Sequence, residues 1–385
     1  MRLPAAAAFF GGLMTKVNFA IVGSWDWDGS DTKKGINICR VNEKTGNLSA
    51  FRNYLPEVKC ASTPEPGKDG MVYFADERKE LKGRKTGGGG YVLAARLDEK
   101  GRMEVVSEEQ SMAVTPSCCC LDASGKYLVV VHHTSTRDSA TKLKKNSKGK
   151  VVQEIIYDDA AVVLFEIGAD GRIGKAVDFH CHKPENGRPS LLHSVYRLPG
   201  SSLLIVCDKG LDKVYSYAVS RGRLVLKDTL SVPEGSDPRY AAFNPGKNLF
   251  YVDNEQRSKL YTISVQKKTG KMKLEAETEL MDQPLIGMAS DVVVSPDGKY
   301  VYTALRMADM ISVCSLDAKG IPHLSECVPS GGSNARGMAF SKDGRFLYVC
   351  NTESDVITVF KVQADGKLKK GRDIHVSRPA NLCFL

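Results

Sequence analysis

Four side chains combine an imidazole, a carboxylate and two permanent positive charges: His193, Arg239, Glu255 and Arg306. A guanidinium group stays protonated and binds carboxylate or phosphate oxygens through two parallel hydrogen bonds. A histidine titrates near neutral pH and acts as a general base when a carboxylate orients the imidazole or a water. The combination indicates proton transfer beside a bound anion. The less specific interpretation is a structural strand histidine and a loop salt bridge.

A turn glycine recurs between short strand-like segments, at positions 46, 101, 171, 222, 270, 320 and 366. A repeat of about fifty residues built from short strands and glycine turns is typical of a β-propeller. In the clearest copy, residues 289–316, an inner strand leads through a Pro-Asp-Gly turn into a β-rich second strand. Residues 61–76 fit this pattern poorly at the inner strand. We predict an all-β fold of seven four-stranded blades.

The two ends of the chain supply complementary parts of one blade. Residues 17–50 contain three strands but no inner one, and residues 379–385 form an inner strand that nothing follows. Pairing them removes two exposed strand edges, so we predict closure of the ring by this blade. One domain then covers residues 14–385, with 134–160 as an inserted mobile loop. Residues 1–13 are expected to be a disordered extension, with a weak signal peptide as the alternative.

Strand direction places the start of each inner strand and the end of each second strand on one face. The inner strands bring to this face His193, Arg239, Asp291 and Arg336. The second-strand ends bring Glu77, His132, His133, Asp208, Glu255, Arg306 and Asn351. We expect the side chains of His193, Arg239, Glu255 and Arg306 to converge on one pocket at this face.

Amino-acid composition indicates which class of ligand the protein binds and in which cellular compartment it is located. The formal net charge is +9, but no nucleic-acid recognition pattern accompanies it, so a small anionic ligand is favoured over nucleic acid. No segment approaches the roughly 18 apolar residues of a membrane span. Eleven cysteines, most of them within predicted strands, indicate buried reduced thiols and a cytoplasmic location. Strand alternation sends Cys181 away from His180 and His182, which argues against a metal site there. The oligomeric state is left open.

The segment LLHSVYRLPGSSLLIVCDKGLDKVYSY (191–217) resembles the seven-bladed lactonase propellers. That family includes a bacterial type of 6-phosphogluconolactonase and the fungal 3-carboxy-cis,cis-muconate lactonizing enzyme. Its pattern is His-Ser, Asp-Leu-Gly-x-Asp, Pro-Arg-His, Asn-Glu and Asn-Arg. The matching positions here are His193-Ser194, Asp208-Lys209-Gly210-Leu211-Asp212, Pro238-Arg239-Tyr240, Asn254-Glu255 and Leu305-Arg306. The resemblance covers residues 17–385 and implies catalytic roles for His193, Arg239, Glu255 and Arg306.

The chain also departs from the family pattern. Lys209 replaces a leucine, and Leu191 stands where the family often has a second histidine. The Pro-Cys-His of an earlier blade is Pro116-Ser117-Cys118, and His132-His133 with the long insertion replaces Asn-Tyr-Gly-Gly. These departures affect the expected substrate more than the expected fold.

The favoured function is hydrolysis of an anionic sugar lactone, as in 6-phosphogluconolactonase, with no metal or other cofactor. In this mechanism His193 activates water, Glu255 orients it, and Arg239 and Arg306 hold the anion and stabilise the oxyanion. Further substrate contacts are expected from Arg336, Asp208 and His133.

Three alternatives stay open. The same residues suit the lactonizing (cyclase) direction, with the proton moved by His193 or Glu255. A calcium-dependent lactonase would use oxygen ligands from several blades, namely Glu77, Asp208, Glu255 and Asn351. A non-catalytic ligand-binding propeller is the third, because this architecture supports many unrelated functions.

Overall fold

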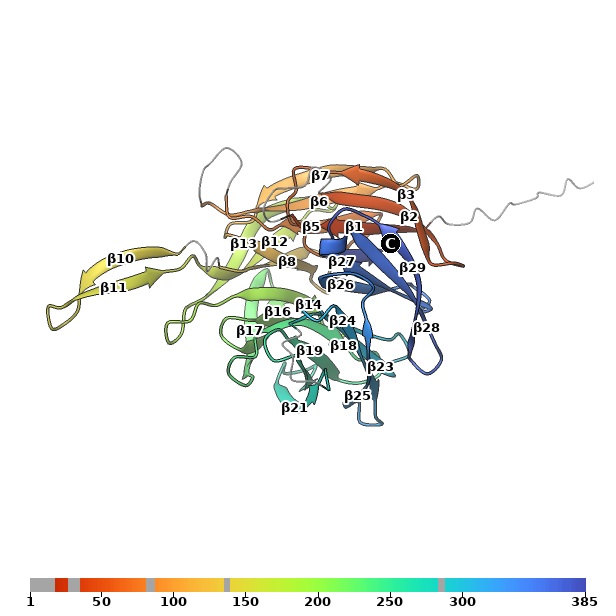
Figure 1. Cartoon of the computed structure of the whole chain (residues 1–385). Coiled ribbons are helices and arrows are strands. Elements are labelled where there is room, and N and C mark those ends of the chain that lie inside the picture. Colours follow the sequence, from red (N-terminus) through yellow and green to blue (C-terminus); the bar gives the residue numbers. More distant parts are fainter. Residues whose placement is uncertain (1–17, 27–34, 81–86, 135–138, 283–287) are drawn as a thin grey trace, which may run out of the picture.

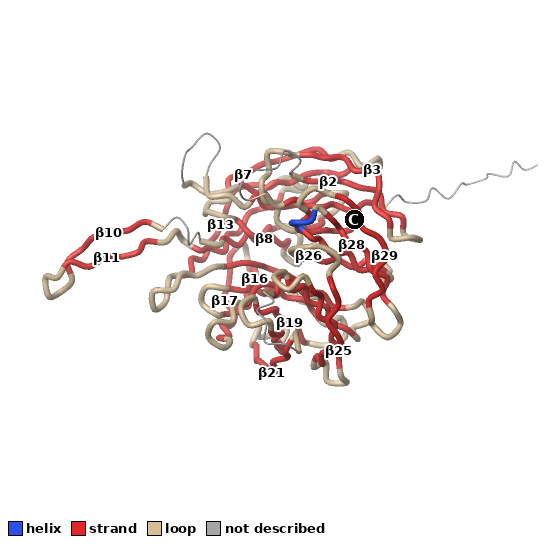
Figure 2. Tube along the Cα trace, in the orientation of Figure 1, coloured by secondary structure: helices blue, strands red, loops and turns tan. Residues whose placement is uncertain are grey.

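Seven four-stranded antiparallel sheets are arranged as the blades of a ring, and an eighth, two-stranded sheet projects from it (Figure 1). The computed structural model describes residues 18–26, 35–80, 87–134, 139–282 and 288–385. The expected extension of residues 1–13 lies outside this range. Almost all of the described chain is strand or turn (Figure 2). The predicted all-β propeller with seven blades is confirmed.

Each blade is given from its inner to its outer strand. Blade one contains β30 (Pro379–Phe384), β1 (Phe19–Ser24), β2 (Ile36–Asn42) and β3 (Asn47–Tyr54). Blade two contains β4 (Glu65–Pro66), β5 (Met71–Asp76), β6 (Tyr91–Leu97) and β7 (Met103–Gln110). Blade three contains β8 (Pro116–Leu121), β9 (Tyr127–His132), β12 (Ala160–Ile167) and β13 (Ile173–His182). Blade four contains β14 (Leu192–Arg197), β15 (Leu203–Asp208), β16 (Lys213–Ser220) and β17 (Arg223–Ser231).

The remaining blades follow the same order. Blade five contains β18 (Pro238–Phe243), β19 (Leu249–Asn254), β20 (Lys259–Val265) and β21 (Met272–Glu279). Blade six contains β22 (Ala289–Val294), β23 (Tyr300–Leu305), β24 (Met310–Leu316) and β25 (Pro322–Pro329). Blade seven contains β26 (Ala335–Phe340), β27 (Phe346–Asn351), β28 (Val356–Val362) and β29 (Leu368–His375), with a 3-10 turn η1 (Thr352–Ser354).

The C-terminal strand closes the ring as predicted. In blade one β30 pairs antiparallel with β1, with Val22 opposite Leu382. Blade one then packs on blade seven through a buried apolar cluster that includes Val22, Cys39, Tyr348 and Ile357. Burying a valine or isoleucine side chain in this way contributes about 1.5–3 kcal/mol. Closure therefore covers the faces and edges of two blades that would otherwise be exposed.

The seven turn glycines join the third strand of each blade to its outer strand, and all have positive φ values between 70° and 89°. Glycine adopts this conformation without the strain that a side chain would introduce. Four of these glycine carbonyls also accept a hydrogen bond from a second-strand tyrosine of the preceding blade. The bond from Tyr302 to Gly366 is 2.7 Å long, and the others join Tyr251 to Gly320, Tyr348 to Gly46 and Tyr73 to Gly171. The repeated turn is thus also a contact between blades.

The insertion in blade three contains secondary structure that the sequence analysis did not predict. Instead of an irregular loop it contains a hairpin, β10 (Ala140–Lys145) paired with β11 (Val151–Ile156), which extends away from the ring (Figure 1). Asn146 Oδ1 accepts hydrogen bonds from the backbone of Lys148 and Lys150, and Gly149 has positive φ. This tight turn allows the lysine-rich β10 to pair with β11.

Two further expectations are met. The inner strand of blade two is only two residues long, in agreement with the poor fit of residues 61–76. Eight of the eleven cysteines are buried, as expected for reduced thiols used as small apolar residues. The part of the chain that the structure describes contains no helix with the length and apolarity needed to cross a bilayer.

Candidate active site

Seven equivalent residues form the rim of the ring at the face where second strands end. In each blade, the first residue after the second strand donates its backbone N–H to a backbone carbonyl at the start of the inner strand. The acceptor directly precedes the inner strand in six blades, and in blade two it is Cys60, five residues earlier. The N–O distances are 3.0–3.2 Å. From blade one to blade seven these rim residues are Trp25, Glu77, His133, Lys209, Glu255, Arg306 and Thr352. We call this face the mouth. The shared hydrogen bond fixes the rim backbone, so the side chains alone differ from blade to blade.

A second tier lies on the inner strands. In six blades the pairing of the inner strand with the second strand shifts register at its first residues. The residues at this bulge are Ser117, His193, Arg239, Ser290, Arg336 and Ala380. A β-bulge re-aims a side chain and is common beside active sites. The bulges therefore give His193, Arg239 and Arg336 equivalent positions in three blades.

Glu255 is the centre of an ion-pair cluster that joins three blades. Its Oε2 lies 2.5 Å from Nζ of Lys209 and 3.4 Å from Nε of Arg239, and its Oε1 pairs with Nη2 of Arg306. Arg239 also donates through Nη1 to the backbone carbonyl of Ser290. The predicted proximity of Arg239, Glu255 and Arg306 is thus seen in the structure. Lys209 is an additional member that the sequence analysis did not select.

The charges in this cluster determine the protonation of Glu255. Burial alone would raise the pKa of the Glu255 carboxyl group, but Lys209, Arg239 and Arg306 together lower it to about 2. Burial lowers the pKa of Lys209, and Glu255 opposes that shift. Three cations therefore surround one permanent carboxylate, so these ion-paired groups by themselves carry an excess of positive charge. Such an excess attracts anions.

His193 lies beside this cluster. Its ring packs edge-on against Tyr240, with ring centroids 5.0 Å apart, and against His133 at 6.0 Å. Within the described residues its buried Nδ1 has no hydrogen-bond partner. Burial, reinforced by the charges of Arg239 and Lys209, holds the pKa of His193 well below 6.5. The imidazole is therefore neutral at neutral pH.

Arg336 extends the positive region toward the other side of the mouth. Its guanidinium carbon lies 4.0 Å from the centroid of the Trp25 ring, a cation–π contact. Burial, together with Arg239 and Arg306, lowers the pKa of Arg336 to about 10, so the group stays charged at neutral pH. Burial raises the pKa of Glu77, and the charge of Arg336 is the largest of the effects that oppose this rise.

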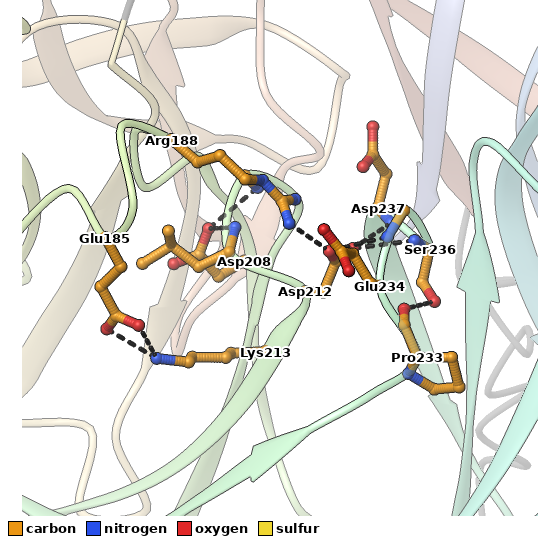
Figure 3. Close-up of polar contacts among 12 residues, drawn as sticks. Glu185, Arg188, Asp208, Asp212, Lys213, Pro233, Glu234, Ser236 and Asp237 are labelled. Atoms are coloured by element: carbon orange, nitrogen blue, oxygen red, sulfur yellow. Dashed lines mark hydrogen bonds and ion pairs between the residues drawn. The ribbon is translucent and has the colours of Figure 1, made fainter.

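Two aspartates hold the loop that carries Lys209. Asp208 Oδ1 accepts hydrogen bonds from the backbone N–H groups of Leu191, Gly210 and Leu211, and Oδ2 accepts from Ser190 and Tyr215. Asp212 pairs with Arg188 at 2.8 Å and accepts the backbone N–H groups of 235–237 in the next blade (Figure 3). Asp237 in turn supplies the carbonyl that receives the Glu255 N–H. This network fixes the spacing between Lys209 and Glu255.

Several predicted face residues point elsewhere because they lie one position before the rim. Side chains alternate along a strand, so the last residue of each second strand points into the blade rather than the mouth. Asp208 is occupied as described above. His132 Nδ1 contacts the carbonyl of Ala161, and Asn351 donates to Ser330 and Thr358. Asp291 follows the bulge and accepts the backbone N–H groups of Val292 and Met338.

The hydrogen bonds that occupy these side chains also affect the two metal-binding alternatives. Asp208 and Asn351 do not turn toward Glu255, so the oxygen donors of the calcium alternative do not form one ring. His180 and His182 both contact the hydroxyl of the buried Tyr217, at 3.0 and 2.8 Å. Across the described ranges, no three His, Cys, Asp or Glu side chains are grouped as a metal site.

Fold and site together define a seven-bladed propeller whose mouth holds an ion-pair cluster beside a buried, neutral imidazole. The sequence profile described as "Lactonase, 7-bladed beta-propeller" matches residues 20–384. The chain belongs to this family of seven-bladed lactonase propellers.

Curated relatives and solved structures agree with this assignment. The chain is 24% identical over 352 residues to a 6-phosphogluconolactonase from Formosa agariphila, covering 87% of this chain and 91% of the relative. It is 25% identical over 291 residues to the 6-phosphogluconolactonase of Erwinia tasmaniensis, covering 72% and 86%. The periplasmic gluconolactonase of Pseudomonas aeruginosa shares the fold, with a TM-score of 0.79 and 21% identity over 96% of this chain and 99% of that one.

Proposed function

We propose that the protein is a lactonase that hydrolyses 6-phosphogluconolactone. The observation that carries the proposal is the buried Glu255 clamped by three cations beside the neutral His193. The names of the curated relatives support the choice of a phosphorylated sugar lactone. The free cysteines support a reducing compartment, and we place the enzyme in the cytoplasm.

In the proposed reaction His193 is the general base. Its neutral imidazole takes a proton from water as the water oxygen attacks the lactone carbonyl. The C–O bond to the ring oxygen then breaks, and the imidazolium returns its proton to that oxygen, which leaves a hydroxy acid. General acid–base catalysis of this kind typically contributes about 10²–10⁴-fold.

The cations have separate roles. Arg239, whose charge already acts on the His193 imidazole, stabilises the oxyanion that forms during attack. Arg306 is more exposed and contacts the phosphate of the substrate. With a pKa of about 2, Glu255 is too weak a base to take the proton from water, so its role is to hold the three cations in place. Arg336 and His133 complete the proposed lining, and Asp208 acts through the loop that it supports.

Turnover by the purified full-length protein tests the proposal. We expect hydrolysis of 6-phosphogluconolactone above its spontaneous rate, with the same rate after treatment with a chelator. Conversion of 3-carboxymuconolactone instead would favour the cyclase alternative, and loss of activity on chelation would favour a calcium enzyme. Binding of the phosphorylated lactone without turnover would identify a non-catalytic propeller.

A further inference from the structure

Lys209 occupies a rim position in blade four, between His133 and Glu255 in the order of the rim. The family pattern has leucine here, so the positive charge is a property of this chain rather than of the pattern. Its ammonium group reaches Glu255 of the neighbouring blade at 2.5 Å. The Asp208 and Asp212 network fixes the loop from which it extends.

The three cations around Glu255 differ in how much of each side chain is exposed to solvent. The side chains of Lys209 and Arg306 are each 14% exposed, whereas those of Arg239 and Glu255 are 2% and 4% exposed. Arg239 is moreover occupied by the carbonyl of Ser290. An anion that enters the mouth therefore meets Lys209 and Arg306 first, one on each side of Glu255.

We propose that Lys209 and Arg306 form a two-point clamp for the substrate's phosphate, and that Lys209 strengthens the preference of this chain for a phosphorylated lactone. This inference rests on the proposed function for the identity of the lactone. An ammonium group has three donors, so Lys209 can keep its contact with Glu255 while another N–H binds a phosphate oxygen. The guanidinium of Arg306 supplies the second contact.

The charge balance favours a dianion. The ion-paired side chains alone, three cations and the carboxylate of Glu255, leave two positive charges. A phosphate monoester carries about −1.5 to −2 at neutral pH and matches this excess, whereas an uncharged sugar lactone does not. Without Lys209 this excess falls to one charge.

Calorimetric binding of 6-phosphogluconate, the expected product, tests the clamp without requiring turnover. Lys209→Met should weaken binding about tenfold to a hundredfold, and Lys209→Arg should restore most of it. Lys213→Met is the matched control, because Lys213 lies in the same blade and pairs with Glu185 outside the mouth. Thermal melting of each variant confirms that it is folded. Equal affinity of wild type and Lys209→Met would overturn the proposal.

A double variant separates direct contact from neutralisation of Glu255. In a Glu255→Gln background, Lys209→Met should still weaken 6-phosphogluconate binding at least tenfold, because the ammonium contact with phosphate is lost there as well. If Lys209→Met no longer weakens 6-phosphogluconate binding in the Glu255→Gln background, Lys209 acts only by neutralising the charge of Glu255. That result would overturn the proposal that Lys209 contacts the phosphate. If wild type binds 6-phosphogluconate through Lys209 but has no lactonase activity, the proposed function fails while the clamp stands.

Discussion

The hydroxyl of Ser194 donates a hydrogen bond to the backbone carbonyl of Arg239 at 2.7 Å. This buried contact joins the inner strands of blades four and five immediately next to the bulges that carry His193 and Arg239. It therefore fixes the separation of the proposed base from the proposed oxyanion-stabilising group. Comparable bonds link other neighbouring inner strands, such as Ser117 to Leu192 and Ser290 to Ala335.

Removing this hydroxyl should destabilise the protein. Ser194→Ala leaves the Arg239 carbonyl buried without that partner, so we expect a loss of about 1–3 kcal/mol in the free energy of unfolding. Ser202→Ala, in an exposed turn of the same blade, should change it by less than about 0.5 kcal/mol. Urea denaturation measures both. Equal stability of the two variants would show that the contact does not support the mouth.

The tyrosine–glycine contacts between blades should also contribute to stability. Tyr302→Phe removes the hydrogen bond to Gly366 while keeping the ring, and we expect a cost of about 0.5–1.5 kcal/mol. Tyr300→Phe, two residues earlier on the same strand, is the control, since no hydrogen bond from its hydroxyl is seen among the described residues. A Tyr302→Phe protein that unfolds at the same urea concentration as the control would contradict this role.

His132 should make the stability of the protein fall in acid. Burial lowers the pKa of His132 to about 4 in the folded protein, against about 6.5 for an unfolded chain. The unfolded state therefore binds the proton first as the pH falls from 6.5 to 4, which reduces the free energy of unfolding over that interval. His132→Asn should remove up to about 3 kcal/mol of this decrease. Urea denaturation at several pH values measures the slope, with His375→Asn, an exposed position, as the control. An unchanged slope in His132→Asn would contradict the prediction.

The projecting hairpin should be dispensable for folding. Strands β10 and β11 pair only with each other, and Ala140 lies opposite Ile156, so a short Gly-Ser link can replace residues 140–156. We expect the melting temperature to change by less than about 2 °C, because no blade loses a strand. A large decrease, measured by circular dichroism, would mean that the hairpin packs on the ring.

Repeats predicted the fold because each blade carries the same turn glycine and the same second-strand pattern. The repeat also predicted closure, because the N-terminal blade lacks an inner strand and the C-terminal segment supplies one. Sequence could not decide which of two adjacent residues faces the mouth. A shift of one residue reverses the direction of a side chain, and the bulge at the start of each inner strand adds such a shift. Asp208 and Asp291 were selected for this reason, and both instead bind backbone N–H groups.

Lys209 was missed for a related reason. It was visible only as a departure from the family pattern, and its partner Glu255 lies 46 positions later in the chain, in another blade. A signal was nevertheless present. Lys209 follows its second strand as Glu255 and Arg306 follow theirs, so aligning the blades on that position would have placed all three on the rim.

The turnover number of His193→Ala with 6-phosphogluconolactone tests the central claim most directly. The variant keeps Lys209, Arg239 and Arg306, so we expect the KM to change little while kcat falls roughly a hundredfold or more. Melting curves and 6-phosphogluconate binding should remain close to those of wild type, which separates loss of the base from loss of the fold or of the anion site. A folded His193→Ala protein with the kcat of wild type would contradict the account.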